Sequence, residues 1–346
     1  MNEKIDLLLR AAFELKASDI HLTVGVPPIM RINGELRKYG KDLLRPNETE
    51  GMAHAIVPSP MWDVFKEKGD LDFSYAIQGI SRFRVNAYMQ RSCVALAIRI
   101  VPTRIPTIDE LELPDVLRKI AEKPHGLVLV TGPTGSGKST SLAAMIHYMN
   151  ETMRKHIITL EDPIEYLHKH GNSIIDQREV GYDTINFSNG LRAALRQDPD
   201  VIMVGEMRDL ETIQTAITAA ETGHLVLGTL HTSSAHATIN RIIDVFPPAQ
   251  QPQIRIQLAT VLVAIVSQRL FPTIDKKNRK AATEIMVNNP AISNLIRNEK
   301  IHQIPSIMQT SRALGMHTLE TSITDLLERG LIQKEQALPY IGEKMI

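Results

Sequence analysis

The sequence predicts an α/β protein in which a small N-terminal α+β domain precedes a larger domain built on a parallel sheet. From about residue 125, the apolar runs GLVLV, HIITL, DVIMVG and HLVLGTL alternate with longer helix-like segments. Such continuous apolar runs are typical of buried parallel strands. The first run leads directly into GPTGSGKST at 132–140, which matches the phosphate-loop pattern G-x-x-x-x-G-K-[ST].

The first hundred residues have the periodicities of a small α+β domain. Apolar side chains recur at helical spacing near the N-terminus and again over residues 48–68. Between these helices, a β-branched stretch is broken at Asn33–Gly34, and Asn-Gly is a strong hairpin signal. Residues 70–102 alternate over three runs separated by Gln78–Gly79 and Arg91–Ser92, which predicts an antiparallel meander.

A proline-containing segment separates the two predicted domains. The stretch VPTRIPTIDELELP carries three prolines, and the change of pattern around it places a linker at 102–108. The sequence therefore predicts an N-terminal domain over 1–101 and a second domain over 109–285. The remaining residues, 286–346, are predicted to be mostly helical.

Composition limits the classes of function. Lys and Arg total 39, as do Asp and Glu, and this zero formal net charge disfavours nucleic acid as a direct partner. The longest apolar run, around LATVLVAIV, is shorter than the ~18 residues of a membrane span, and the start of the chain lacks signal-peptide order. A single cysteine, Cys93, excludes an internal disulfide and a four-cysteine zinc site. We therefore expect a cytoplasmic protein without a transmembrane segment.

The phosphate loop has the strand before it and the helix-compatible segment after it that the motif requires. Its glycines let backbone N–H groups turn toward phosphates, and the helix N-terminus adds partial positive charge. Lys138 is expected to reach the β- and γ-phosphates, and Ser139 to bind Mg²⁺. The predicted nucleotide-binding positions are Gly132, Pro133, Thr134, Gly135, Ser136, Gly137, Lys138, Ser139 and Thr140. The chain is therefore expected to bind ATP or GTP.

Acidic residues follow two of the other predicted strands. The stretch TLEDPIEY carries Glu161, Asp162 and Glu165, and VIMVGEMRD carries Glu206. Since the carboxyl ends of parallel strands meet at the edge where the phosphate loop lies, these acids are candidates for binding a metal ion or orienting the attacking water. The alternative is that they cap helices or pair with nearby arginines, namely Arg178, Arg196 or Arg208.

Two histidines lie at the ends of a further apolar strand, in GHLVLGTLHTSSA. The seven-residue offset between His224 and His231 predicts opposite faces of the strand, which argues against joint binding of a metal ion. We expect one of them to sense the γ-phosphate or to hold the catalytic loop; the alternative is a structural hydrogen bond. His168 and His170 are expected to be solvated loop residues.

Together these motifs resemble a known family. GPTGSGKST, TLEDPIEYLH, LRQDPDVIMVGEMRD and AAETGHLVLGTLHT stand in the order and spacing of the four signature boxes of the secretion-type traffic ATPases, which serve type II and type IV secretion and type IV pili. In that family glycine takes the usual Walker B aspartate position and glutamate follows, as Gly205 and Glu206 do here. The resemblance spans nearly the whole chain. It implies a PAS-like N-terminal domain and a RecA-like P-loop domain with a helical C-terminal part, assembled as a homohexamer.

Within the superfamily the chain most resembles the retraction ATPases of type IV pili. The PAS-like domain begins almost at once, and the four-cysteine zinc element of the extension and type II secretion relatives is missing. The stretch AISNLIRNEKIHQI at 291–304 is similar to the retraction-linked signature A-I-R-N-L-I-R-E, with Ser293 and Asn298 as departures.

The resemblance to the retraction ATPases implies a function and a location. The expected activity is Mg²⁺-dependent ATP hydrolysis that powers pilus retraction and twitching motility. The motor would act at the inner face of the cytoplasmic membrane, with an inner-membrane pilus platform protein as partner. An accessory retraction ATPase and a secretion or extension ATPase remain alternatives. Two alternatives of other classes are a hexameric nucleic-acid translocase and a nucleotide-bound scaffold with little turnover.

The resemblance also assigns roles to single residues. Glu206 is expected to hold Mg²⁺ through water. Glu165, in preference to Glu161, would polarise the attacking water, and His231, supported by His224, would contact the γ-phosphate. Arg84 and Arg99 lie fifteen positions apart on adjacent predicted strands of the small domain. They would reach the nucleotide when that domain closes and stabilise charge in the transition state.

Overall fold

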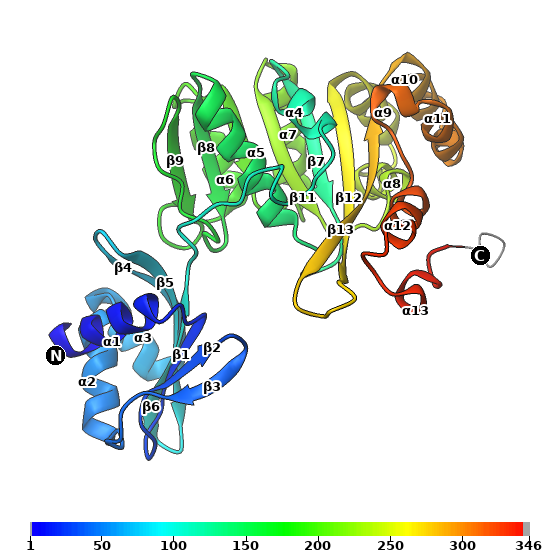
Figure 1. Ribbon diagram of the computed structural model, residues 1–346. Helices are drawn as coiled ribbons and strands as arrows, with labels where there is room; N and C mark the ends of the chain where they lie inside the picture. Colours follow the sequence, from blue (N-terminus) through cyan, green and yellow to red (C-terminus); the bar gives the residue numbers. More distant parts are fainter. Residues whose placement is uncertain (1, 342–346) are drawn as a thin grey trace. The chain divides into compact units, whose positions relative to one another are not determined.

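The computed structural model describes residues 2–341 and divides into two compact units (Figure 1). The first unit comprises Met1–Arg104 with Glu165–Leu167, and the second comprises Ile105–Ile164 with His168–Ile346. The division after Arg104 falls inside the segment 102–108 that the sequence predicts as a linker. The return of Glu165–Leu167 to the first unit was not predicted; within that unit, Leu167 N donates to Pro102 O at 3.4 Å.

The first unit combines three helices with a six-stranded antiparallel sheet. Its elements are α1 (Asn2–Glu14), β1 (Asp19–Leu22), β2 (Ile29–Ile32), β3 (Glu35–Lys38), α2 (Pro46–Ile56), α3 (Ser59–Lys68), β4 (Asp70–Ile77), β5 (Ser81–Gln90) and β6 (Cys93–Ile100). The strand order is β3-β2-β1-β6-β5-β4. The predicted helices and the predicted three-stranded meander are therefore confirmed.

Two tight turns in this sheet are where the sequence placed them. Asn33 and Gly34 connect β2 to β3 with φ angles of 51° and 85°, as a two-residue hairpin turn of the I′ type requires. Arg91 and Ser92 connect β5 to β6, also with positive φ. Phe83, Val85 and Ala87 alternate inward from β5 into a core shared with the three helices, so the residues between them point to the other face.

The second unit is an α/β fold on a seven-stranded sheet. Its first elements are α4 (Val116–Ala121), β7 (Gly126–Thr131), α5 (Lys138–Thr152), β8 (His156–Glu161), β9 (Ile174–Glu179), α6 (Phe187–Ala194), β10 (Val201–Val204), α7 (Leu210–Glu221), β11 (Leu225–Leu230) and α8 (Ala235–Asp244). Those that follow are α9 (Gln251–Val261), β12 (Leu262–Pro272), β13 (Arg279–Val287), α10 (Pro290–Arg297), η1 (Ile301–Gln303), α11 (Ile304–Thr310), η2 (Arg312–Leu314), α12 (Leu319–Glu328) and α13 (Lys334–Ala337).

The strand order of the larger sheet is β13-β12-β7-β11-β10-β8-β9. All neighbours pair in parallel except β12 and β13, which form an antiparallel hairpin. The four apolar runs of the sequence form β7, β8, β10 and β11, so the predicted parallel sheet is confirmed. Strands β9, β12 and β13 were not predicted from the sequence. The predicted domain boundary at 285 was wrong in detail, because β13 continues to Val287.

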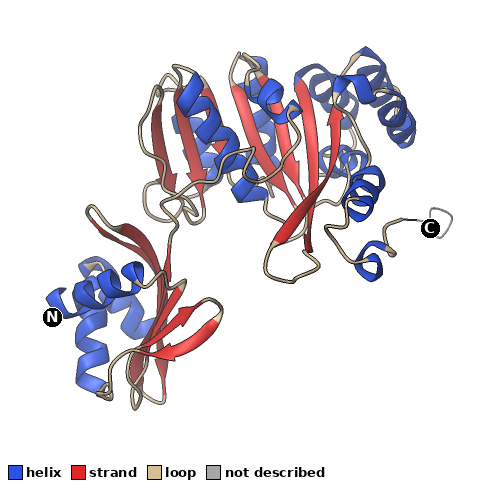
Figure 2. Cartoon of the chain, in the orientation of Figure 1, coloured by secondary structure: helices blue, strands red, loops and turns tan. Residues whose placement is uncertain are grey.

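Helices cover both faces of this sheet (Figure 2). Leu127 and Leu129 of β7 face a core built with α6 to α10. Val128 and Val130 of the same strand face a second core built with α4 and α5. A strand buried on both faces carries no polar alternation, which explains why these strands read as continuous apolar runs.

The C-terminal helices pack into two different cores. Ile292 and Ile296 of α10 extend the first core of the sheet, whereas Ile323 of α12 and Ala337 of α13 form a smaller cluster with Phe271 and Ala282 of β12 and β13. Residues 286–341 are mostly helical, as the sequence predicts. Ser293 is buried, and its hydroxyl donates to Ala259 O at 2.9 Å and to Asn288 Oδ1 at 3.1 Å. Asn298 closes the last turn of α10 by donating to Asn294 O. Both departures from the retraction-linked signature therefore have local structural partners.

Among residues 2–341, no helix is both long enough and apolar enough to cross a membrane.

The expectation that His168 is a solvated loop residue was wrong. Its ring Nδ1 is buried without a hydrogen-bond partner among the described residues. Burial, with a smaller contribution from His147, lowers the pKa of His168 to about 4. His170 is exposed as expected, and its Nδ1 accepts a hydrogen bond from Ile175 N.

This burial predicts a specific loss of stability in acid. The folded pKa of His168 lies below its ordinary value of 6.5, so the unfolded chain binds the extra proton between pH 6.5 and pH 4 and stability falls as the pH drops. At pH 5 the loss is about 2 kcal/mol, or roughly 3 °C in Tm. His168→Gln should therefore show a smaller fall in Tm between pH 7.5 and pH 5 than the wild type. His170→Gln is the matched control; an unchanged fall in His168→Gln would contradict the assignment.

Candidate functional site

The predicted phosphate loop and three of the predicted site residues follow neighbouring parallel strands at one edge of the larger sheet. Thr131 at the end of β7 pairs with Leu230 at the end of β11, so residues 132 and 231 leave the sheet together. Val204 at the end of β10 pairs with Gly228 on one side and Leu160 on the other. The phosphate loop, His231, Glu206 and Glu161 therefore emerge at the carboxyl edge, where ligands bind in α/β sheets.

The loop between β7 and α5 depends on its glycines. Gly132, Gly135 and Gly137 have φ angles of 144°, 78° and 88°, in the region that favours glycine. The loop ends at the N-terminus of α5, a 15-residue helix whose N-cap residue, Gly137, supplies no side-chain hydrogen bond. A helix N-terminus of this kind favours the binding of an anion. Lys138 Nζ reaches back over the loop and donates to Gly132 O at 2.9 Å and Pro133 O at 3.1 Å.

Ser136 gives a direct indication that the loop is built around a polar ligand. The residue is only 3% exposed, and its hydroxyl has no hydrogen-bond partner among the described residues. Buried polar groups without partners are uncommon in folded proteins because each one costs free energy. The backbone geometry, the lysine and this hydroxyl together fit a bound phosphate chain.

Glu206 and His231 come together at the same edge. His231 Nε2 lies 2.7 Å from Glu206 Oε1, and Arg208 Nε donates to the same oxygen. Hydrogen bonding to Glu206 raises the pKa of Arg208. The Glu206 side chain is 19% exposed, whereas that of Arg208 is 75% exposed. The carboxylate is thus held at the sheet edge by a histidine from the next strand and by an exposed, displaceable arginine.

Packing explains why glycine occupies position 205. A β-carbon there would lie 3.0 Å from Leu160 O and 3.4 Å from the α-carbon of Glu161. Gly205 N also donates to Leu160 O at 2.7 Å. An aspartate at this position would press on the end of β8, so the carboxylate is supplied one residue later by Glu206.

Glu161, the last residue of β8, and Glu165, which follows the strand, have different surroundings. Glu161 is buried, and its Oε1 accepts hydrogen bonds from Thr159 Oγ1 at 2.6 Å and from Gln177 Nε2 at 3.0 Å. Glu165 is exposed and belongs to the first compact unit. Glu161 is therefore fixed as a hydrogen-bond acceptor within the sheet edge, and Glu165 is the more accessible carboxylate of the pair.

The expectation that His224 supports His231 is not met within the chain. His224 precedes β11 at the amino edge, where its Nδ1 lies 3.0 Å from Ala219 O and 3.2 Å from Thr222 Oγ1. The six residues of β11 lie between the two histidines, which places them about 23 Å apart at the usual rise per strand residue. This separation along the strand keeps His224 away from the phosphate loop. It also prevents the two histidines from sharing a metal ion, which we predicted from their opposite faces.

In the first unit, Arg84 and Arg99 are direct register partners on β5 and β6. Paired residues of an antiparallel sheet project on the same face, so the predicted adjacency is confirmed. Arg84 is exposed, and Arg99 Nε donates to Asp19 Oδ1 at 2.9 Å while its side chain stays 68% exposed. Burial acts to raise the pKa of Asp19, but the hydrogen bonds from Arg99 and Ser18 outweigh it and lower that pKa.

Two residues at the carboxyl edge, Arg208 and Gln268, were not predicted as site residues. Arg208 was considered only as an alternative partner for the acids. Gln268, on β12, was not considered, although its side-chain amide contacts the phosphate loop. The available signal was the polar pair Ser267–Gln268 inside the apolar stretch LVAIVSQRLFP, which makes little sense in a strand buried on both faces unless its polar groups have partners.

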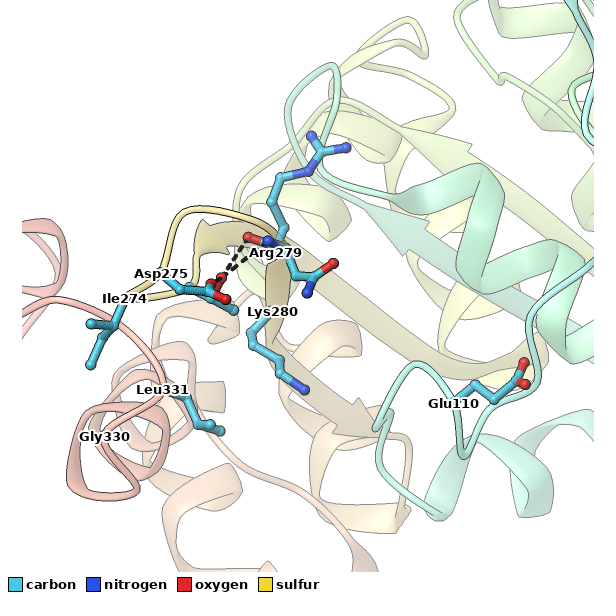
Figure 3. Close-up of a pocket in the computed structure, with 9 residues that line it drawn as sticks. Glu110, Ile274, Asp275, Arg279, Lys280, Gly330 and Leu331 are labelled. Atoms are coloured by element: carbon cyan, nitrogen blue, oxygen red, sulfur yellow. Dashed lines mark hydrogen bonds between the residues drawn. The ribbon is translucent and has the colours of Figure 1, made fainter. Parts of the chain in front are cut away.

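A separate hollow of about 610 Å³ lies beside the turn between β12 and β13 (Figure 3). It contains none of the predicted site residues. Two of its charged side chains have partners nearby: Lys280 pairs with Glu112, and Asp275 accepts a hydrogen bond from Lys277 N. The residues that line it are Glu110, Thr273, Ile274, Asp275, Asn278, Arg279, Lys280, Gly330 and Leu331. This hollow lacks the glycine-rich backbone of the phosphate loop.

Comparison with known proteins adds an independent finding. The family model described as "Type II/IV secretion system protein" matches residues 1–321. The chain is 46% identical to the type IV pilus retractation ATPase PilT of Pseudomonas aeruginosa, over 96% of this chain and 97% of that protein. It is 43% identical to the type IV pilus ATPase PilU of the same species, over 97% of this chain and 88% of that protein.

The structure also has a close relative among solved structures. A crystal structure of the pilus retraction motor PilT with bound ADP is 48% identical and has a TM-score of 0.90. The similarity covers 98% of this chain and 97% of that one.

Proposed function

Since the chain belongs to the type II/IV secretion system protein family, we propose that it is an ATPase motor that powers type IV pilus retraction and hence twitching motility. The observation that carries this proposal is the carboxyl edge of the larger sheet. There, a complete phosphate loop lies beside the Glu206–His231 pair. The near full-length similarity to a retraction ATPase supports the biological role.

The loop residues from Gly132 to Thr140 would hold the phosphates of ATP. Backbone N–H groups of the loop and of the first turn of α5 would bind phosphate oxygens, and the buried Ser136 hydroxyl would gain the partner it lacks. Lys138 would exchange its bonds with Gly132 O and Pro133 O for the β- and γ-phosphates.

Ser139 and Glu206 would hold Mg²⁺. Among the described residues, no group of three or more His, Cys, Asp or Glu side chains is placed to bind a metal ion. That fits Mg²⁺, which commonly keeps several waters and binds through one or two protein oxygens together with substrate phosphates. When bound, Mg²⁺ neutralises charge on the β- and γ-phosphates.

The remaining roles fall to side chains at the edge and in the first unit. His231, held by Glu206, would donate to the γ-phosphate from the end of β11. Glu165 would orient the attacking water, while the buried Glu161, already engaged by Thr159 and Gln177, would keep the end of β8 in place. Arg84 and Arg99 would reach the nucleotide when the first unit closes on it, as differential contacts to ATP and ADP require for a motor.

The same proposal includes the finer architecture and the assembly. We take the first unit to be PAS-like, the second to be RecA-like, and the working form to be a homohexamer. In this proposal the ring acts at the inner face of the cytoplasmic membrane, where domain closure would move an inner-membrane platform protein.

One further function has specific support. The 43% identity to PilU makes an accessory pilus ATPase the second candidate. It ranks below a retraction ATPase because the chain covers 88% of PilU but 97% of PilT. A nucleic-acid translocase has less support, since the formal net charge is zero and only 4% of residues are aromatic.

Deleting the gene in the source organism tests the proposed function. A retraction motor predicts cells with excess surface pili and no twitching motility. Cells with few or no pili would instead indicate an extension or secretion ATPase, and unchanged pili and motility would reject the motor role.

A further inference from the structure

Gln268 lies beside the phosphate loop, although 132 positions separate it from Ser136 in the sequence. Strand β12 pairs in parallel with β7 as far as Ser267 and Thr131, so the next residue of β12 is level with the start of the loop. Gln268 is only 3% exposed. An amide buried this completely needs partners for its polar atoms.

Both ends of that amide are engaged. Gln268 Nε2 donates to Ser136 O at 2.8 Å, and Gln268 Oε1 accepts from Ser141 Oγ at 2.8 Å. Ser136 belongs to the phosphate loop, and Ser141 belongs to the first turns of α5. A side-chain amide carries a donor and an acceptor together, so one residue can bridge loop and helix in a way that a carboxylate or an alkyl chain cannot.

The same residue accounts for two of the loop glycines. A β-carbon at Gly137 would lie 2.7 Å from Gln268 Nε2, and one at Gly132 would lie 2.3 Å from Gln268 O. Both distances are too short for a carbon atom. The outer side of the loop backbone therefore packs closely against β12, while its inner side faces the position of the ligand.

The bond to Ser136 O fixes a peptide plane. In a trans peptide, the C=O of one residue and the N–H of the next point in opposite directions. Because the Ser136 carbonyl is turned outward to Gln268, the Gly137 N–H is turned toward the opposite side of the chain, the interior of the loop. Preset donors of this kind strengthen binding because no reorganisation is needed when the anion arrives.

We propose that Gln268 is a positioning residue that presets the phosphate loop, by holding the 136–137 peptide with its N–H available to a nucleotide phosphate. The inference rests on the proposed function, since it assumes that the loop binds a nucleotide. Gln268 acts through the loop, so its removal should weaken nucleotide binding more than it slows the bound reaction.

The test compares full-length Gln268→Met with the wild type. Methionine keeps the length of the side chain and removes both hydrogen bonds, so we expect the Kd for Mg-ADP, measured by calorimetry, and the KM for ATP each to rise about tenfold. The kcat at saturating ATP should change less than about threefold, because the groups that act on the phosphates remain. Gln268→Glu should weaken binding further, since a carboxylate oxygen would then face Ser136 O.

A matched control separates positioning from general packing. Ser267→Ala removes the 2.8 Å bond between Thr131 Oγ1 and Ser267 Oγ, on the same pair of strands but away from the loop carbonyl. Its ADP affinity should equal that of the wild type. An equal loss of affinity in both variants would overturn the inference, as would a folded Gln268→Met protein that binds ADP normally.

A variant at Ser141 keeps the test decisive if Gln268→Met does not fold. Ser141→Ala leaves Gln268 in place and frees its amide to rotate, so ADP should bind about threefold more weakly; unchanged affinity would contradict the inference. ADP binding by the wild-type protein distinguishes failure of the proposed function from failure of the inference. If it binds no ADP, the proposed function fails and the inference fails with it, whereas a binding wild type with unaffected variants rejects the inference alone.

Discussion

A Lys138→Ala protein is expected to lose ATP hydrolysis by roughly 10³-fold. Lys138 Nζ lies over the phosphate loop, within 3.1 Å of two loop carbonyls, and its flexible side chain can transfer that charge to a phosphate chain. Removing it deletes a preorganised positive charge from the place where negative charge develops during phosphoryl transfer. Steady-state phosphate release from the purified protein, with Mg²⁺ and saturating ATP, measures the effect.

Lys123→Ala is the matched control for this loss. Lys123 is an exposed lysine just before β7, at the amino edge of the same sheet and away from the phosphate loop. The Lys123→Ala protein should hydrolyse ATP at the wild-type rate. Turnover by Lys138→Ala within a few fold of the wild type would show that the loop is not the hydrolytic site.

Glu206→Gln is expected to lower kcat by roughly 10²-fold while nucleotide binding persists. The substitution keeps the size of the side chain but removes the charge that attracts Mg²⁺ and that pairs with His231 at 2.7 Å. Since the phosphate loop is untouched, the Kd for ATP should change much less than kcat. Rapid-quench hydrolysis and equilibrium binding on the same preparation separate the two quantities.

A second carboxylate provides the comparison for Glu206. Glu211, on α7, pairs with Arg192 and is half exposed, so Glu211→Gln also breaks an ion pair with an arginine. Its kcat should stay within about twofold of the wild type, because exposed ion pairs contribute little. Equal losses in the two variants would mean that Glu206 acts only through general stability.

Much of the fold could be predicted because the governing signals are local. Asn33–Gly34 specifies its own turn through the positive φ of both residues, and the runs that form β7 and β11 are apolar because both faces are buried. The phosphate loop was likewise predictable, because the spacing of its glycines is a local pattern. Strand β9 was missed because its sequence, IIDQRE, is half polar, as suits a strand at the edge of the sheet.

The parts of the site that escaped prediction depend on contacts distant in sequence. Gln268 reaches the loop only because β12 returns beside β7, which no local pattern reveals. His224 and His231 look equivalent in the sequence, and the direction of β11 decides which one reaches the carboxyl edge. The burial of His168 likewise comes from tertiary packing, because its surroundings in the sequence, YLHKHG, are polar.

If ATP hydrolysis at this sheet edge drives pilus retraction, a protein that binds ATP but hydrolyses it slowly should stop retraction and leave extension intact. The measurement is to follow individual fluorescently labelled pili in source cells whose gene encodes Glu206→Gln in place of the native protein. The pili should extend at the wild-type rate and then fail to retract. Retraction at the wild-type speed, or a loss of extension, would show that hydrolysis at this edge does not drive retraction.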